Sequence, residues 1–167
     1  MNNLIWKILL IIQPFIGNIF VSLFGGNINE NNRDWYKKLN QSPLTPPNIV
    51  FPIVWSILYL FLGISALLVY IKCLKNPKTF KNIFLLKYLT TYEIQLLLNF
   101  LWSIFFFGLQ KPKISLIIVF FMIALTAYLL YQSWDISKPA FWLLLPYGIW
   151  ITFAMYLNFH IVVKNKV

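Results

Sequence analysis

Charge is scarce in this sequence, and acidic residues are scarcest. Of 167 residues, 11% are charged and four are Asp or Glu, whereas 60% are hydrophobic. An ordinary soluble domain is about 25% charged, and a soluble core of this chain length has no room for so much apolar surface. The composition excludes a soluble globular domain and predicts an integral membrane protein with one domain, residues 1–167.

Cysteine and the usual catalytic motifs are nearly absent as well. Cys73 is the one cysteine, which excludes an internal disulfide and a cysteine metal cluster. The sequence lacks a Ser/His/Asp set, a phosphate-binding glycine loop and zinc-ligand spacing, so we expect no metal site. His160 has no second His, Cys or nearby carboxylate, and we expect interfacial packing, with axial contact to a haem iron as the alternative.

The positive charges raise the question of nucleic acid. The 14 Lys and Arg residues do not form a stripe but lie at the edges of apolar runs, as do Lys72 and Lys75. Cations in such positions typically meet lipid headgroups, so we expect the lipid bilayer as a partner and no nucleic acid. Seven cations would fall on each membrane face, so their distribution does not choose an orientation.

Long apolar runs are what the sequence has in abundance. A bilayer core about 30 Å thick needs about 20 apolar residues in a helix, and five runs reach that length. They are residues 4–24, 49–71, 83–107, 114–134 and 140–163. The runs are too long and uniformly apolar for the strands of a membrane barrel. The sequence therefore predicts an all-α bundle of five transmembrane helices, with the termini on opposite faces.

Aromatic and amide side chains recur on one face of three runs. These faces carry Trp55 and Tyr59 on the second run, Gln95, Asn99 and Trp102 on the third, and Tyr147, Trp150, Ala154 and Asn158 on the fifth. An amide in lipid is costly without a partner, so the faces should point into the bundle. Two interpretations remain open: hydrogen bonds between helices with an aromatic belt, and an interior cavity for a large, flat, mostly apolar ligand.

Two further features leave alternatives open. Residues 25–48 are proline-rich at their end and are either a connector that leads the chain into the second run or a lid over the cavity. Pro52 fits a first helical turn, where a missing N–H costs little. Glu93 lies near the middle of the third run, where a carboxylate costs about 2.5–3.5 kcal/mol on insertion scales. We expect Glu93 to be protonated or paired with a pocket hydroxyl.

Several segments carry a resemblance that extends over nearly the whole chain. They are Trp35–Tyr36, Leu39, TPP at 45–47, VFPIVWSILY at 50–59, QLLLNFLWSIFFFG at 95–108 and LLPYGIWITFAMYLN at 144–158. In this order they resemble the TspO/MBR family of tryptophan-rich sensory and translocator proteins. The resemblance implies a five-helix bundle with an interior ligand cavity closed by the first loop. It also implies a homodimer in a membrane, here a bacterial cell membrane.

The resemblance further implies the ligands and the residues that hold them. Family ligands include porphyrins, haem and synthetic isoquinoline or benzodiazepine-type compounds, and no cofactor is required. The family's pocket positions correspond to Trp55, Asn99, Tyr147, Trp150 and Ala154. Further ligand-binding residues are expected at Trp35, Leu44, Pro47, Tyr59, Gln95 and Trp102. The family's loop usually reads Lys-Pro-x-Trp, and Leu44 stands here in place of that tryptophan. The sterol motif of the animal proteins' last span is not met, so sterol transport is not expected.

Two functions of different classes follow from the resemblance. The first is a receptor or translocator that binds tetrapyrroles and signals or moves them without turnover. The second is an enzyme that degrades porphyrins with light and oxygen, in which case Trp55 and Trp150 would be the catalytic residues. We favour binding, because the sequence arranges no general acid or base for conventional chemistry.

Overall fold

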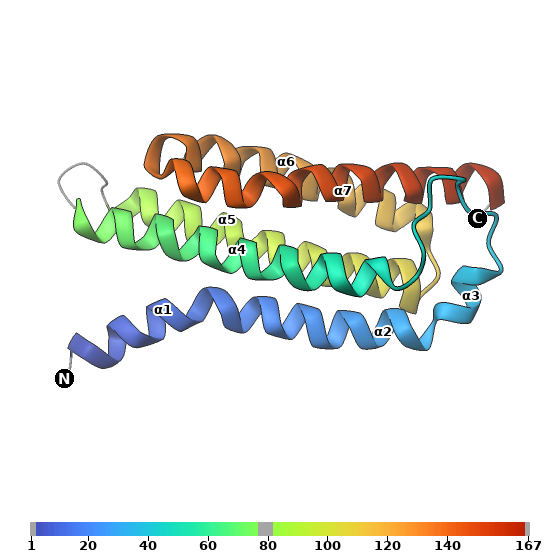
Figure 1. Cartoon of the computed structure of the whole chain (residues 1–167), viewed down its shortest axis with the longest axis horizontal. Coiled ribbons are helices and arrows are strands. Elements are labelled where there is room, and N and C mark those ends of the chain that lie inside the picture. Colours follow the sequence, from blue (N-terminus) through green and yellow to red (C-terminus); the bar gives the residue numbers. More distant parts are fainter. Residues whose placement is uncertain (1–2, 77–81, 166–167) are drawn as a thin grey trace.

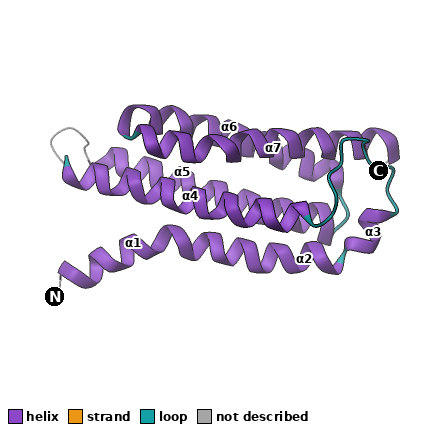
Figure 2. Ribbon diagram, in the orientation of Figure 1, coloured by secondary structure: helices purple, strands orange, loops and turns teal. Residues whose placement is uncertain are grey.

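The computed structural model describes residues 3–76 and 82–165, and these are helical apart from short connections (Figures 1 and 2). No strand occurs within these two ranges. The elements are α1 (Asn3–Phe20), the π-helical segment η1 (Val21–Gly25), α2 (Gly26–Asn31), α3 (Arg33–Lys37), α4 (Val50–Lys75), α5 (Asn82–Ser103), the π-helical segment η2 (Ile104–Gly108), α6 (Pro112–Ile136) and α7 (Lys138–Asn165). The all-α class is confirmed.

The long helices run antiparallel to their neighbours in sequence. Helix α1 continues through η1 into α2, and α5 continues into η2. With the short helices α2 and α3, the described residues hold more helices than the five that the sequence predicts, and the long helices α1, α4, α5, α6 and α7 lie along one axis (Figure 1). The chain therefore starts at one end of the long axis and finishes at the other. This end-to-end arrangement places α3, the turn between η2 and α6, and the end of α7 together.

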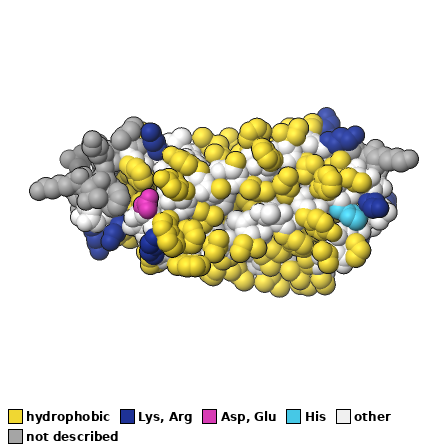
Figure 3. Space-filling view, turned by 90° about the horizontal axis from the view of Figure 1, so that it is seen from above, with side chains coloured by type: hydrophobic (Ala, Val, Ile, Leu, Met, Phe, Trp, Pro, Cys, Tyr) yellow, Lys and Arg dark blue, Asp and Glu magenta, His cyan; other side chains and the backbone are white. Residues whose placement is uncertain are grey.

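The surface of the bundle is suited to lipid. Helices α4, α6 and α7 are long and apolar enough to cross a membrane, among the residues that the structure describes. Helix α5 is not among them, because Lys87, Glu93 and its interior amides lower its mean hydropathy. Apolar side chains cover the middle of the molecule and cations gather toward its two ends (Figure 3). This distribution is typical of an integral membrane protein.

The segment that connects α1 to α4 differs from the expected loop. Residues 25–48 begin with α2 and α3, so helix continues well past Phe24. The two short helices meet at Asn32, which leaves the helical region (φ −110°, ψ 14°) and whose side-chain amide donates to the Ile28 carbonyl oxygen at 2.9 Å. The remaining connection, residues 38–49, holds the prolines, and Pro52 lies in the first turn of α4 as expected.

Glu93 faces away from the interior of the bundle. Its carboxyl group accepts a hydrogen bond from the Gln13 side chain on α1. Of our two expectations for Glu93, pairing with a pocket hydroxyl is therefore wrong. The reason is helix geometry. Gln95 is two residues further along α5, so its side chain points about 200° around the helix from that of Glu93. Glu93 and Gln13 thus join α1 to α5 on the side away from the buried amides.

Candidate functional site

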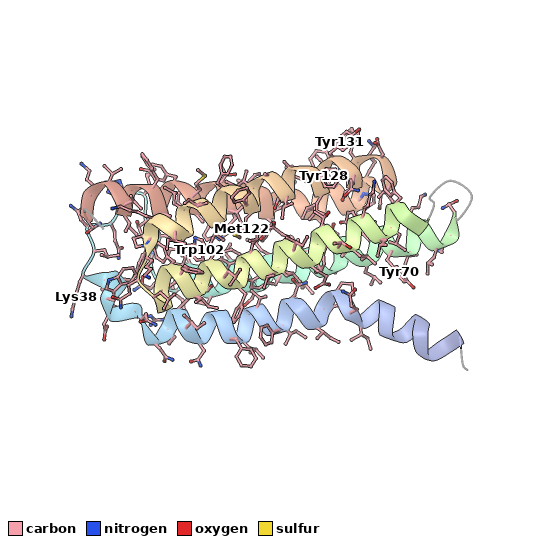
Figure 4. The ribbon with its side chains drawn as sticks, turned by 180° about the vertical axis from the view of Figure 1, so that it is seen from behind. Lys38, Tyr70, Trp102, Met122, Tyr128 and Tyr131 are labelled. Carbon is pink, nitrogen blue, oxygen red and sulfur yellow. The ribbon has the colours of Figure 1, made fainter. Side chains whose placement is uncertain are left out.

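A pocket of about 190 Å³ lies between the helices at the end of the bundle that carries α3. Its lining comes from η1, α2, α3, the start of α4, the end of α5 with η2, and the second half of α7. Trp102 projects from α5 among these elements, and Lys38 marks the same end of the molecule (Figure 4). The pocket therefore collects residues from segments that are far apart in sequence.

One wall of the pocket consists of aromatic rings from α4 and α7 that pack against one another. Trp55 stacks on Tyr59 with ring centroids 5.4 Å apart, and the Trp150 ring meets Trp55 edge to face at 6.4 Å. Phe51 and Phe153 also pack on Trp150, with ring centroids 6.1 Å and 5.7 Å from that of Trp150. Edge-to-face and offset pairs are the favoured aromatic geometries, so the two indole rings are held at a right angle.

A second aromatic wall comes from the end of α5. Trp102 stacks on Phe106 at 5.0 Å and 13°, and Phe107 meets the Trp102 ring edge to face at 5.9 Å. Phe106 and Phe107 belong to η2, whose wider turn presents neighbouring rings to the pocket. Helix η1 borders the same space, and single π-helical turns frequently accompany functional sites.

Gly25 allows η1 to approach this wall. A Cβ built on Gly25 would lie 3.2 Å from the Ser103 hydroxyl oxygen, which is closer than most side chains tolerate. Gly25 and Ser103 both line the pocket. The glycine thus sets the spacing between η1 and α5 at this part of the pocket lining.

The polar floor of the site is a buried chain of hydrogen bonds. The Tyr59 hydroxyl donates to Asn99 Oδ1 at 2.8 Å, and the Asn99 amide donates to the Tyr147 hydroxyl at 2.9 Å. Gln95 Nε2 donates to the same Tyr147 oxygen at 2.7 Å. Helices α4, α5 and α7 are therefore joined by polar contacts directly beneath the aromatic rings.

Two buried polar atoms beside the pocket have no partner in the described structure. They are the indole Nε1 of Trp150 and the side-chain Oδ1 of Asn29. Buried polar groups nearly always find a hydrogen bond. A ligand with an acceptor near Trp150 and a polar group near Asn29 would satisfy both.

The mouth of the pocket is formed by the short helices α2 and α3. Tyr36 is buried there against Phe106 and Phe107, with ring centroids 6.0 Å and 5.5 Å away. Burial raises the pKa of the Tyr36 phenol to about 12, with the Thr45 side chain opposing the shift. Tyr36 is therefore neutral at physiological pH, and the charges at the mouth are those of Arg33 and Glu30, which form an ion pair.

The structure brings most of the predicted site residues together. Those that line the pocket are Trp55, Tyr59, Asn99, Trp102, Trp150 and Ala154. Gln95 and Tyr147 lie behind them in the hydrogen-bonded floor. Trp35 packs on Phe106 at 5.8 Å outside the lining. Leu44 is 63% exposed, and neither it nor Pro47 lines the pocket.

Several lining residues were not predicted from the sequence. Phe51 precedes Trp55 by four positions and Phe106 follows Trp102 by four, so helical periodicity could have found both. The segment that holds Asn29, Glu30 and Arg33 was expected to be a loop. Helical periodicity does not predict which residues of a loop line a pocket. Asn158 lines the pocket, but its amide lies 2.9 Å from the Ser115 hydroxyl on α6 and so also joins two helices.

No metal site is evident in the described ranges 3–76 and 82–165. No group of three His, Cys, Asp or Glu side chains lies close enough together there to hold an ion. The His160 ring instead lies 6.5 Å from the ring of Tyr156 on the same helix.

Comparison with known proteins shows the family to which this sequence belongs. A sequence model of the TspO/MBR family matches residues 10–164. The tryptophan-rich protein TspO of Archaeoglobus fulgidus is 35% identical over 154 residues, covering 90% of this chain and 88% of that protein. The tryptophan-rich sensory protein of Cereibacter sphaeroides is 32% identical, covering 75% and 73%. The translocator protein of Bos taurus is 31% identical, covering 80% and 76%. The chain belongs to the TspO/MBR family.

Proposed function

We propose that this protein is a membrane sensory or translocator protein that binds a tetrapyrrole, a porphyrin or haem, in the α4–α5–α7 pocket. The observation that carries the proposal is that two sets of packed aromatic rings line one pocket, Trp55 with Trp150 and Trp102 with Phe106. Flat aromatic surfaces of this kind suit a large planar ligand. The names of two relatives, tryptophan-rich sensory protein and translocator protein, support the broader role.

The proposal places all five passes of the chain across a bacterial cell membrane. Helices α4, α6 and α7 meet the length and apolarity that a span requires. The first pass, α1 with η1, and the third, α5 with η2, run beside them along the same axis (Figure 1). The side-chain amides of Gln95 and Asn99 on α5 are turned inward and hydrogen-bonded to Tyr147, which is how a spanning helix tolerates amides.

Ligand entry requires the α3–α4 connection to move. The pocket volume of about 190 Å³ is below the roughly 300–1,000 Å³ of typical ligand sites. The connection is fastened to α7: the Asn40 backbone N–H donates to Asn165 Oδ1 at 2.7 Å, and the Ser42 and Tyr156 hydroxyls are 3.0 Å apart. Asn48, in the same connection, lines the pocket. Release of the contacts with α7 would let this part of the lining move, so we propose that residues 38–49 act as a lid.

Conservative substitutions in the pocket test the binding site. We expect Trp55→Phe and Trp150→Phe each to raise the dissociation constant for protoporphyrin roughly threefold to tenfold, because an aromatic contact contributes about 0.5–1.5 kcal/mol beyond its area. Asn99→Ala should weaken binding as well, since it disrupts the floor. Quenching of tryptophan fluorescence and the shift of the porphyrin Soret band measure the affinity. Trp142→Phe is the control, because Trp142 is 60% exposed on the outer surface. Equal affinities for all these variants would place the site elsewhere.

The contact between Trp55 and Trp150 also supports a second candidate function, the degradation of porphyrins with light and oxygen. The ring centroids of the two indoles are 6.4 Å apart, so both side chains could react with one photoexcited porphyrin and oxygen. Illumination of the purified protein with protoporphyrin in air distinguishes the two functions. Loss of the Soret band that depends on both tryptophans would support degradation, whereas an unchanged band would support binding without turnover.

A further inference from the structure

The mouth of the pocket combines a cation with an otherwise aromatic interior. Of the described residues that line the pocket, Arg33 is the one with a positive charge and Glu30 the one with a negative charge. Their side chains are 41% and 60% exposed, so both lie where the pocket meets solvent. A ligand whose apolar body filled the interior would have one edge beside these two groups.

The partner that Arg33 has in this structure is easily exchanged. Arg33 donates to the Glu30 carboxylate three residues before it, across the junction of α2 and α3. Exposed ion pairs of this spacing contribute little to stability, because water and salt screen them. The guanidinium could therefore turn to another carboxylate without loss of the fold.

Asn29 supplies a second group at the same place. Its side-chain Oδ1 is buried with no hydrogen-bond partner, although the residue lines the pocket one position before Glu30. An amide that turns by a half rotation presents its NH₂ in place of its oxygen. Arg33 and Asn29 together would then offer several N–H donors to one carboxylate, and a planar guanidinium fits a carboxylate through two parallel hydrogen bonds.

We propose that Arg33, with Asn29, forms a carboxylate-recognition site at the mouth of the pocket, and that the ligand is a planar aromatic molecule with a carboxylate on one edge. This inference rests on the proposed function and adds to it the charge and the orientation of the ligand. The aromatic walls hold the apolar body, and Arg33 exchanges Glu30 for the ligand carboxylate. Lys38 at the same end of the molecule would attract the anion toward the mouth (Figure 4).

A matched pair of porphyrins tests the proposal. Protoporphyrin IX has two carboxylates, and its dimethyl ester has the same ring without charge. Dissociation constants for both are measured with the full-length protein in phosphatidylcholine nanodiscs. We expect Arg33→Gln to weaken protoporphyrin IX about tenfold and to change the ester less than twofold, because a hydrogen bond to a charged group is lost for the acid alone. Arg33→Lys should retain part of the affinity, since lysine keeps the positive charge but lacks the planar guanidinium that forms two parallel hydrogen bonds.

Two further variants separate recognition from structure. Glu30→Gln removes the competing carboxylate, so it should tighten protoporphyrin IX and leave the ester unchanged. Lys37→Gln is the control: Lys37 pairs with Asp34 at the same three-residue spacing, and Lys37 does not line the pocket. Lys37→Gln should change neither affinity.

The outcomes are distinct. Equal weakening of acid and ester by Arg33→Gln would show that Arg33 supports only the shape of the mouth, and no effect on either would also overturn the proposal. If the unaltered protein binds the ester as well as the acid, the carboxylate is not recognised although the aromatic pocket is correct. If it binds neither porphyrin, the proposed function itself is wrong.

Discussion

The interior polar contacts converge on the hydroxyl group of Tyr147. It accepts one hydrogen bond from Gln95 and one from Asn99, and Asn99 accepts another from Tyr59. Tyr147 is fully buried, and so is nearly all of Gln95 and Asn99. The Tyr147 hydroxyl is the one partner that the structure shows for the NH₂ group of each amide, so each depends on this oxygen.

Removal of that oxygen should therefore destabilise the protein. We expect Tyr147→Phe to lower the free energy of unfolding by about 1–3 kcal/mol, because it leaves two buried amide donors unpaired. Thermal unfolding in detergent measures the loss. Tyr131→Phe is the control, since Tyr131 is 70% exposed on the outer face of α6 (Figure 4). A melting temperature equal for both variants would mean that the amides find other partners.

Close packing between helices decides the position of α1. Gly63 on α4 faces α1, and a Cβ built there would lie 2.8 Å from two ring carbons of Phe15 and 3.0 Å from the Asn18 amide nitrogen. Asn18 is itself held by the Pro14 carbonyl oxygen and the Tyr92 hydroxyl. The glycine thus allows α1 to reach both α4 and α5.

A pair of glycine substitutions tests this contact at the scale of the element. We expect Gly63→Ala to destabilise the protein by about 1–3 kcal/mol, because α1 must move away from α4 to relieve the overlap. Gly26→Ala should be neutral or slightly stabilising, since a Cβ there meets nothing within 4 Å and the residue is helical. Thermal unfolding compares the two. A larger loss for Gly26→Ala would contradict the packing of α1.

The sequence could predict the long helices and the interior face of the site, but neither the short helices α2 and α3 nor the mouth of the pocket. Side chains three or four residues apart share a helical face, so Trp55, Trp102 and Trp150 could be assigned to the interior from spacing alone. The course of residues 38–49 depends instead on contacts such as Asn40 with Asn165, 125 positions away. Contacts of that separation leave no periodic signal. Leu44 was expected at the site from the resemblance to the family's loop alone, and it is exposed.

At the scale of the whole molecule, the site lies toward one end of an elongated bundle. The pocket is lined by the first half of α4 and the second half of α7, whereas Lys75 and Asp135 lie at the far ends of α4 and α6. A ligand would therefore enter from the membrane face that holds the α3–α4 connection. The direction of sensing or transport depends on which side of the membrane that face occupies.

Labelling of introduced cysteines tests whether α4, α5 and α6 cross the membrane and in which direction. The background is Cys73→Ser, because Cys73 is the one native cysteine and is buried. Leu44→Cys and Gln110→Cys place thiols in the two connections at the pocket end, and Lys75→Cys and Asp135→Cys place them at the other end; all four positions are exposed. A membrane-impermeant maleimide applied to intact cells should label one pair and not the other, since helices that span the bilayer keep the two ends on opposite sides. Labelling of Leu44→Cys without Gln110→Cys would mean that the passes between them do not both cross, and the five-span arrangement would be wrong.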